Sequence, residues 1–144
     1  MSSTFLVGLD GSEQSINAVK YAAEHAEHEG AKLILAHAIE WSGFDIMGPE
    51  ELAERHKIRE AEIVHAQETI IQPLLDILEG KAIEIESTVH HGHATKTLLG
   101  LVQAHNVDHI FIGRHGASRL AIAIVGSTTN SLIQAADVPV TVVP

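Results

Sequence analysis

Two glycine-containing segments in the last third of the chain carry the residue types that bind phosphate. Gly113-Arg114-His115-Gly116 follows an apolar run, and Gly126-Ser127-Thr128-Thr129 begins after nine further residues. A glycine directly after a buried strand lets the backbone turn tightly and approach a ligand with no Cβ in the way. Ser127 and the two threonines are typical of a helix N-cap whose N–H groups point outward. Because a free helix N-terminus beside a glycine-rich loop suits phosphate, this pattern predicts nucleotide binding.

A third segment, Asp10-Gly11-Ser12, follows the first apolar run of the chain. Ligands of open α/β sheets bind beyond the carboxyl ends of the strands, where the strand order reverses. In a flavodoxin-like arrangement this segment and the loop from Gly113 to Ser127 flank the same crevice. Asp10 either contacts the nucleotide or caps the first helix. Arg114, His115 and Arg119 are the cationic candidates in the longer loop.

The elements that must position these residues alternate between strands and helices. Strands are predicted at residues 4–9, 32–39, 82–89, 108–112 and 138–143. Helices are predicted from Ser12 to Gly30, from Pro49 to Gly80 with a kink at Pro73, from Ala94 to His105, and from Thr128 to Ala136. The alternation indicates an α/β fold with a parallel sheet and right-handed crossovers. A length of 144 residues favours one domain, 1–144.

Composition narrows the classes of partner. The formal net charge of −10 argues against nucleic acid and against docking on an anionic membrane, because both require Lys and Arg. No apolar run approaches the ~20 residues of a membrane-spanning helix. The absence of cysteine excludes disulfides and thiolate metal sites. The first residues lack the basic start of a signal peptide, so a cytoplasmic location is expected.

The spacing Gly-x-x-Gly, nine residues, Gly-Ser closely resembles the ATP-binding pattern of the universal stress protein family. Asp10-Gly11-Ser12, His37-Ala38-Ile39 and the closing Val138-Pro139-Val140-Thr141-Val142-Val143 are also similar to segments of that family. The resemblance covers the whole chain. It implies a single five-stranded parallel sheet of order 3-2-1-4-5 with helices on both faces, and it implies that the ligand is ATP.

The resemblance also implies roles for particular residues. Adenine is expected near Asp10 and Ala38, and ribose near Gly92 and Gly113. The phosphates are expected on a further group: Gly116, Gly126, Ser127 and Thr128, with Thr129 close by. Ala38 is smaller than the valine common in the family, and residues 120–125 lack the basic side chains that many members carry. A triphosphate in so acidic a chain calls for Mg²⁺ to share its charge.

These expectations point to a regulatory protein that acts through nucleotide-dependent assembly. Its partner could be a transporter, a kinase or another enzyme. No Gly-x-x-x-x-Gly-Lys-Ser/Thr run is present, and no nucleophile and base are paired near the loop, so negligible turnover is expected. The alternatives are a slow ATPase or nucleotidyl-transfer enzyme, and a flavin-binding electron carrier.

The stretch from Val138 to Val143 is predicted to be an edge strand that pairs with its twin. It contains no charge, and edge strands without charges recruit other chains through their open N–H and C=O groups. The resemblance implies the same homodimer. A higher oligomer built from such dimers is left open. The competing hypothesis is that the long helix or the C-terminus covers this edge.

Three further segments leave alternatives open. His90-His91-Gly92-His93 is compatible with a metal site, with the His-x-Gly-His signature of nucleotidyltransferases, or with solvated histidines beside the nucleotide. Ile122, Ile124 and Val125 are either core residues or a contact for a partner. The aromatic stretch from Trp41 to Gly48 either packs as a loop or acts as a lid over the nucleotide.

Overall fold

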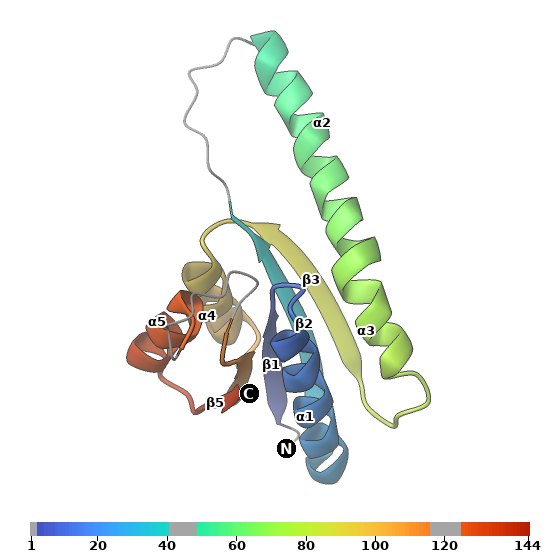
Figure 1. Ribbon diagram of the computed structural model, residues 1–144, viewed down its shortest axis with the longest axis vertical. Helices are drawn as coiled ribbons and strands as arrows, with labels where there is room; N and C mark the ends of the chain where they lie inside the picture. Colours follow the sequence, from blue (N-terminus) through green and yellow to red (C-terminus); the bar gives the residue numbers. More distant parts are fainter. Residues whose placement is uncertain (1–2, 41–48, 116–124) are drawn as a thin grey trace.

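The computed structural model describes residues 3–40, 49–115 and 125–144, which contain one five-stranded sheet of order β3-β2-β1-β4-β5 (Figure 1). All four strand pairs are parallel. The strands are β1 (Thr4–Leu9), β2 (Lys32–Ile39), β3 (Ile85–His91), β4 (His109–Gly113) and β5 (Val140–Val143). The predicted fold class and strand order are confirmed.

Helices cover both faces of this sheet (Figure 1). They are α1 (Glu13–Glu29), α2 (Pro49–Ala66), the π-helical turn η1 (Gln67–Ile71), α3 (Gln72–Ile77), α4 (Ala94–Ala104) and α5 (Ser127–Ala135). Buried side chains of α1, η1 and α3 pack on one face, and those of α4 and α5 pack on the other. No helix in the described part of the chain is both long enough and apolar enough to cross a membrane.

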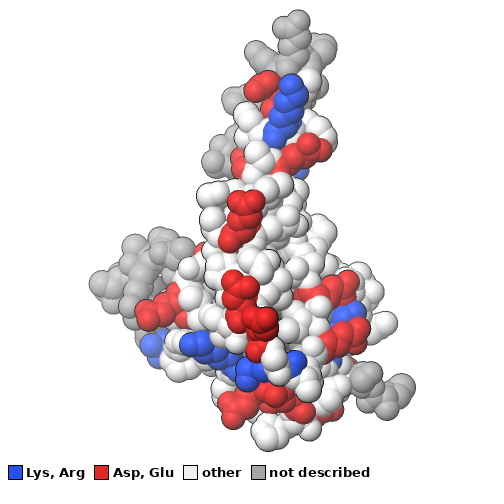
Figure 2. All heavy atoms as spheres, turned by 90° about the vertical axis from the view of Figure 1, so that its right-hand side faces the viewer, with Lys and Arg blue, Asp and Glu red and all other residues white. Residues whose placement is uncertain are grey.

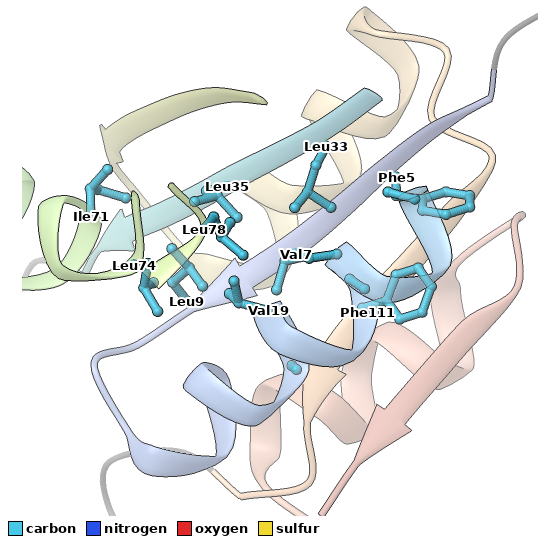
Figure 3. Close-up of a cluster of buried hydrophobic side chains, with 14 of the residues drawn as sticks. Phe5, Val7, Leu9, Val19, Leu33, Leu35, Ile71, Leu74, Leu78 and Phe111 are labelled. Atoms are coloured by element: carbon cyan, nitrogen blue, oxygen red, sulfur yellow. The ribbon is translucent and has the colours of Figure 1, made fainter. Parts of the chain in front are cut away.

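The central strand β1 supplies both hydrophobic cores, because its successive side chains point to opposite faces. Phe5, Val7 and Leu9 belong to the core under α1 and α3, which Figure 3 shows, and Leu6 belongs to the core under α4 and α5. A strand buried on both faces is almost entirely apolar, as the sequence of this strand is. The sheet therefore holds the carboxyl end of β1 in a fixed position between two packed layers.

The long second helix is interrupted, and the interruption starts before the predicted kink at Pro73. Pro73 has no N–H to donate to the carbonyl four residues earlier, so a regular α-helix cannot pass through it. In η1 the N–H of Gln72 bonds to the carbonyl of Gln67, five residues earlier. The Thr69 hydroxyl donates to the His65 carbonyl at 2.7 Å. The π-helical turn thus connects α2 to α3 at the point where the regular α-helix is interrupted. Beyond this turn, α2 projects away from the sheet (Figures 1 and 2).

Some element boundaries differ from the predicted ones. β3 begins at Ile85 rather than at residue 82, and its exposed residues agree with its place at the sheet edge. β4 includes Gly113, which was expected in the following loop. β5 begins at Val140 because Pro139 contributes only its carbonyl, which accepts the Ile110 N–H at 2.9 Å.

Aromatic and histidine rings pack together beneath the edge strand β5. His109 stacks on Phe111 with ring centroids 4.4 Å apart and an interplanar angle of 13°. His109 Nε2 also lies 2.6 Å from Thr141 Oγ1 on β5. Burial lowers the pKa of His109; neighbouring Glu29 opposes this shift and His25 adds to it.

We expect the free energy of unfolding to fall as the pH is lowered from about 7 to about 5, and to fall less in His109→Gln. The folded-state pKa of His109 lies below the ordinary unfolded value of about 6.5. Between these two pKa values the unfolded chain binds more protons than the folded chain. The contribution of His109 to the free energy of unfolding is therefore complete above the unfolded pKa and is lost as the pH falls through the folded pKa. Urea unfolding at both pH values measures it.

His28→Gln is the matched control for this prediction, because His28 is exposed in the last turn of α1. This control should retain the wild-type dependence on pH. An equal loss of stability in wild type and His109→Gln between the two pH values would contradict the assignment to His109.

Candidate functional site

A cavity of about 410 Å³ opens at the carboxyl ends of β1, β2 and β4. Ligand cavities in proteins commonly measure roughly 300–1,000 Å³, so this one can enclose a small molecule. Its wall includes the small or apolar residues Gly8, Ala36, Leu98 and Ile112. Polar groups from the starts of α4 and α5 complete it, so an apolar surface and polar helix ends face the same space.

The segment after β1 is organised by two local hydrogen bonds. Asp10 Oδ1 accepts from the Ser12 N–H at 2.9 Å, and Ser12 Oγ accepts from the Ser15 N–H at 3.2 Å. Ser12 is therefore the cap of α1, as expected, and the alternative that Asp10 is this cap is wrong. Gly11 has a φ of +81°, which favours glycine in the turn. Asp10 lines the cavity, whereas Gly11 and Ser12 are not among its lining residues.

Gly113 at the end of β4 is required by packing against α1. A Cβ built at Gly113 would lie 2.8 Å from the Cβ and 2.9 Å from the carbonyl carbon of Gln14. The sequence hypothesis explained this glycine by the approach of a ligand, but the Cβ position points to the first turn of α1. Gly113 still lines the cavity, and its carbonyl accepts the Thr129 hydroxyl at 2.7 Å. That buried hydrogen bond ties α5 to β4.

The N-terminus of α5 faces the cavity, and none of the side chains that the structure describes caps it. Gly126 is the N-cap residue, and Ser127 is the first helical residue rather than the expected cap. The first N–H groups of a helix have no partner within it, and the helix dipole makes this end positive. Ser127 and Thr128 line the cavity here. This end of the cavity is therefore suited to an anion such as phosphate.

One backbone hydrogen bond joins the two ends of the loop between β4 and α5, and a second ties the start of this loop to the end of β5. The Gly126 N–H donates to the Arg114 carbonyl at 2.8 Å, and the Arg114 N–H donates to the Val143 carbonyl at 2.8 Å. His115 lines the cavity, whereas Arg114 is exposed and is not among its lining residues. Gly116, Ile122 and Ile124 lie outside the described residues. Val125 is half-buried where the described chain resumes.

The N-terminus of α4 is the second helix end at the cavity, and a carboxylate occupies it. His93 is the N-cap residue, and Glu40 Oε1 accepts from the Ala94 N–H at 3.0 Å. Glu40, His93 and the buried Thr95 all line the cavity. The sequence analysis placed His93 in a histidine segment beside the nucleotide as one alternative, but it assigned neither Glu40 nor Thr95 to the site. A signal for Glu40 was present, because it directly follows β2 at the same sheet edge as Asp10.

The cavity thus brings together most, but not all, of the predicted site residues. Those that line it are Asp10, Ala38, Gly113, His115, Gly126, Ser127, Thr128 and Thr129. Gly11, Ser12, Gly92 and Arg114 are not among its lining residues. Gly92 has a φ of +150° and its N–H donates to the Ile39 carbonyl, so it forms the turn between β3 and α4.

The histidines around Gly92 have separate structural contacts. The His91 side chain is only 6% exposed, and its Nε2 lies 3.0 Å from Glu62 Oε2 of α2, so the prediction of solvated histidines is wrong for His91. His90 Nε2 lies 2.7 Å from Thr88 Oγ1. Within the described ranges no group of three or more His, Cys, Asp or Glu side chains could hold a metal ion. The segment 41–48, predicted as packed loop or lid, lies outside these ranges.

Comparison with known sequences identifies one family. The model of the universal stress protein family matches residues 1–144. A universal stress protein of Mycobacterium tuberculosis is 26% identical over 151 residues, which cover 96% of this chain and 47% of that protein. One of Mycolicibacterium smegmatis is 27% identical over 139 residues, with the same coverage of 96% and 47%. The chain spans about half the length of the curated relatives it matches.

Solved structures show the same fold. Universal stress protein UspA from Lactobacillus plantarum superposes with a TM-score of 0.84 at 22% identity, covering 99% of this chain and 97% of that one. A universal stress protein in complex with cAMP has a TM-score of 0.64 at 25% identity, with coverage of 99% and 96%. One from Archaeoglobus fulgidus in complex with dAMP has a TM-score of 0.67 at 18% identity, with coverage of 100% and 98%.

Proposed function

Because the chain belongs to the universal stress protein family, we propose that it binds ATP in the cavity at the carboxyl ends of β1, β2 and β4. The observation that carries this proposal is the cavity itself, where an apolar wall meets the N-terminus of α5, an end that no side chain among the described residues caps. An apolar surface suits the base, and open N–H groups suit the phosphates. Relatives solved with cAMP and dAMP support an adenine nucleotide as the class of ligand.

The proposed placement follows the described lining of the cavity. Adenine lies near Asp10 and Ala38, ribose lies near Gly113, and phosphates lie at the start of α5 on Gly126, Ser127 and Thr128. His115 is beside the phosphates. The resemblance also assigns Gly11, Ser12, Gly92 and Arg114 to the nucleotide; in this proposal their role is indirect, because none of them lines the cavity.

We propose that Mg²⁺ binds together with the triphosphate of ATP. The described residues offer no cluster of three or more metal-binding side chains. Mg²⁺ usually keeps several waters and is bound by phosphates with one or two carboxylates. The residues proposed at the phosphates, Ser127 and Thr128, carry hydroxyls rather than carboxylates, so phosphate oxygens and water would supply most of the ligands of the ion. When bound, the ion would neutralise part of the phosphate charge.

We assign a regulatory role rather than rapid catalysis. Two hydroxyls at the cavity are already engaged in structural hydrogen bonds: Ser15 Oγ donates to the Ser12 carbonyl at 2.8 Å, and Thr129 Oγ1 donates to the Gly113 carbonyl. They are therefore poorly placed to act as activated nucleophiles. Turnover is expected to be negligible, and the bound state itself is the signal.

The proposed mechanism is assembly controlled by ATP in a single domain, 1–144, located in the cytoplasm. A ligand at about 100 times its Kd stabilises the bound state by about 2.7 kcal/mol, which is sufficient to bias an assembly equilibrium. The binding loop follows β4, and β4 pairs with the edge strand β5. We propose that β5 forms a homodimer and that an unidentified protein partner senses the nucleotide-bound state.

Gly126→Val should weaken ATP binding at least tenfold, a loss of about 1.4 kcal/mol or more. The branched side chain would stand at the N-cap of α5, in the space proposed for phosphate. Gly126 has φ −64° and ψ 158°, a conformation open to any residue, so the backbone tolerates the change. Isothermal titration calorimetry with Mg²⁺ and ATP measures the affinity.

Gly100→Val is the control, because a Cβ at Gly100 on α4 meets no atom within 4 Å. This variant should bind ATP with wild-type affinity. Unchanged affinity in Gly126→Val would overturn the phosphate placement. A wild-type protein that binds no adenine nucleotide would overturn the proposed function.

A further inference from the structure

Three buried polar side chains of the described residues line the cavity, and one of them differs from the other two. They are Ser15, Thr95 and Thr129. The hydroxyls of Ser15 and Thr129 each donate to a backbone carbonyl. Thr95 is 8% exposed, and none of the hydrogen bonds among the described residues involves its hydroxyl.

The Thr95 hydroxyl is open to the cavity. Within the described ranges, no side-chain oxygen or nitrogen is both fully buried and without a partner, so this oxygen is not sealed off by the protein. Thr95 lines the cavity wall, which is the space that the oxygen can reach. A threonine hydroxyl can donate one hydrogen bond and also accept. The cavity therefore offers a buried hydrogen-bonding group that the protein itself leaves unused.

Two hydrogen bonds hold the start of α4, where Thr95 lies, against the end of β2. The Gly92 N–H donates to the Ile39 carbonyl at 3.0 Å. The Ala94 N–H donates to Glu40 Oε1 at 3.0 Å. Thr95 is the next residue of α4, so its backbone is fixed at the carboxyl end of β2.

The face of α4 that carries Thr95 is turned toward the sheet. Leu98 lies three residues later on the same face and packs over Gly8 of β1, where an added Cβ would be 2.9 Å from Leu98 Cδ1. Since α4 leads from the end of β3 back to the start of β4, it runs antiparallel to the strands. Thr95 therefore lies about one helical turn, roughly 5 Å, beyond Gly8 toward the carboxyl ends. That is the level of Asp10 and Ala38, which line the same cavity.

The proposed binding mode directs one edge of the base toward this place. Ribose is proposed at Gly113 on β4, and adenine is proposed at Asp10 and Ala38, so the base extends across β1 toward β2. The sugar of a purine nucleotide is attached to the five-membered ring. The six-membered ring is therefore the part farthest from the ribose, and its edge carries ring nitrogens and the exocyclic amino group of adenine.

We propose that Thr95 is a specificity-determining residue whose hydroxyl hydrogen-bonds the polar edge of the six-membered ring of the base. The inference rests on the proposed nucleotide binding and specifies how the base is selected. Leu98 and Ile112 of the apolar wall can pack equally well against a carbon ring of the same size. A carbon ring would leave the buried hydroxyl unpaired, which is costly, whereas a ring with nitrogen at this edge would satisfy it.

The test compares ATP with benzimidazole riboside 5′-triphosphate by isothermal titration calorimetry in the presence of Mg²⁺. This analogue keeps the ribose and the phosphates of ATP, but its six-membered ring contains only carbon and has no amino group. The wild type should bind ATP at least tenfold more tightly than the analogue. In Thr95→Val this preference should fall at least fivefold, mainly because ATP binds more weakly. Valine keeps the β-branched shape of threonine, so Thr95→Val should bind the analogue at least as tightly as the wild type does.

Two further variants are the controls. Thr95→Ser retains the hydroxyl and should keep the wild-type preference. Thr97→Val makes the same chemical change on the same helix, at a residue that does not line the cavity, and should also keep it. An unchanged preference in Thr95→Val, or an equal fall in either control, would overturn the inference.

The wild type separates this inference from the proposed function. Equal binding of ATP and the analogue by the wild type would overturn the role of Thr95 and leave nucleotide binding in place. A wild type that binds no adenine nucleotide would overturn the proposed function and this inference with it.

Discussion

Phe111→Ala should lower the free energy of unfolding by about 3 to 5 kcal/mol, the usual cost of emptying a buried phenylalanine site. Phe111 is 2% exposed and lies at the centre of the ring cluster beneath β5. Its ring centroid is 4.4 Å from that of His109 and 5.2 Å from that of Phe5. These neighbours belong to adjacent strands of the sheet, so they cannot move together to refill the space. Urea denaturation monitored by circular dichroism measures the change.

Ile133→Ala is the control for this experiment, because Ile133 is a large apolar residue of α5 that is 50% exposed. Its replacement should change stability by no more than about 0.5 kcal/mol. A loss below about 1 kcal/mol in Phe111→Ala would show that the ring cluster is not the rigid core that its packing indicates.

Val142→Lys should convert the proposed homodimer into a monomer at micromolar concentration. The carbonyls of Pro139 and Val143 accept hydrogen bonds from β4. Along a strand, the N–H and C=O groups of successive residues point alternately to the two neighbouring positions in the sheet. Because Val143 points its carbonyl toward β4, the N–H and C=O of Val142 point away from β4, toward the outer edge of β5. A lysine at such an edge opposes pairing with a second strand, and a desolvated charge at the pairing line is costly. Multi-angle light scattering with and without ATP reports the mass.

The control introduces the same charge away from this edge. Ile133→Lys on α5 should leave the dimer intact, and circular dichroism should show that both variants are folded. A wild-type protein that is monomeric with and without ATP would refute the dimer. A Val142→Lys variant that remains dimeric would place the interface elsewhere.

The topology was predictable because it depends on long-range alternation of apolar segments, which single residues do not disturb. Strand β1 was predicted at residues 4–9 and is observed there, since its apolar run is bounded by Asp10. Boundaries were harder at prolines and at helix starts. Whether Gly126 or Ser127 caps α5 depends on backbone angles that either residue can adopt, so residue preference alone could not decide it.

The site was predictable in outline and incomplete in detail for a different reason. A glycine can be required for several different structural reasons. Gly113, Gly92 and Gly11 were all assigned to the nucleotide, but Gly113 is required by packing, and Gly92 and Gly11 lie in turns. The position of Glu40 after β2 was a signal for the site, but its hydrogen bond with Ala94 could not be predicted because it joins positions 54 residues apart that no local pattern links. Likewise, nothing in the sequence near His91 indicates that Glu62 lies against it.

The π-helical turn at Gln67–Ile71 acts as a one-residue insertion in an otherwise continuous helical rod. Each α-helical residue advances about 100° around the axis, so the turn sets the rotational phase of α2 relative to α3. Deleting one residue from it would turn every side chain of α2 by about that angle. Glu62 would then point away from His91, which it now approaches to 3.0 Å. The number of residues in this turn thus sets which face of α2 is directed at β3.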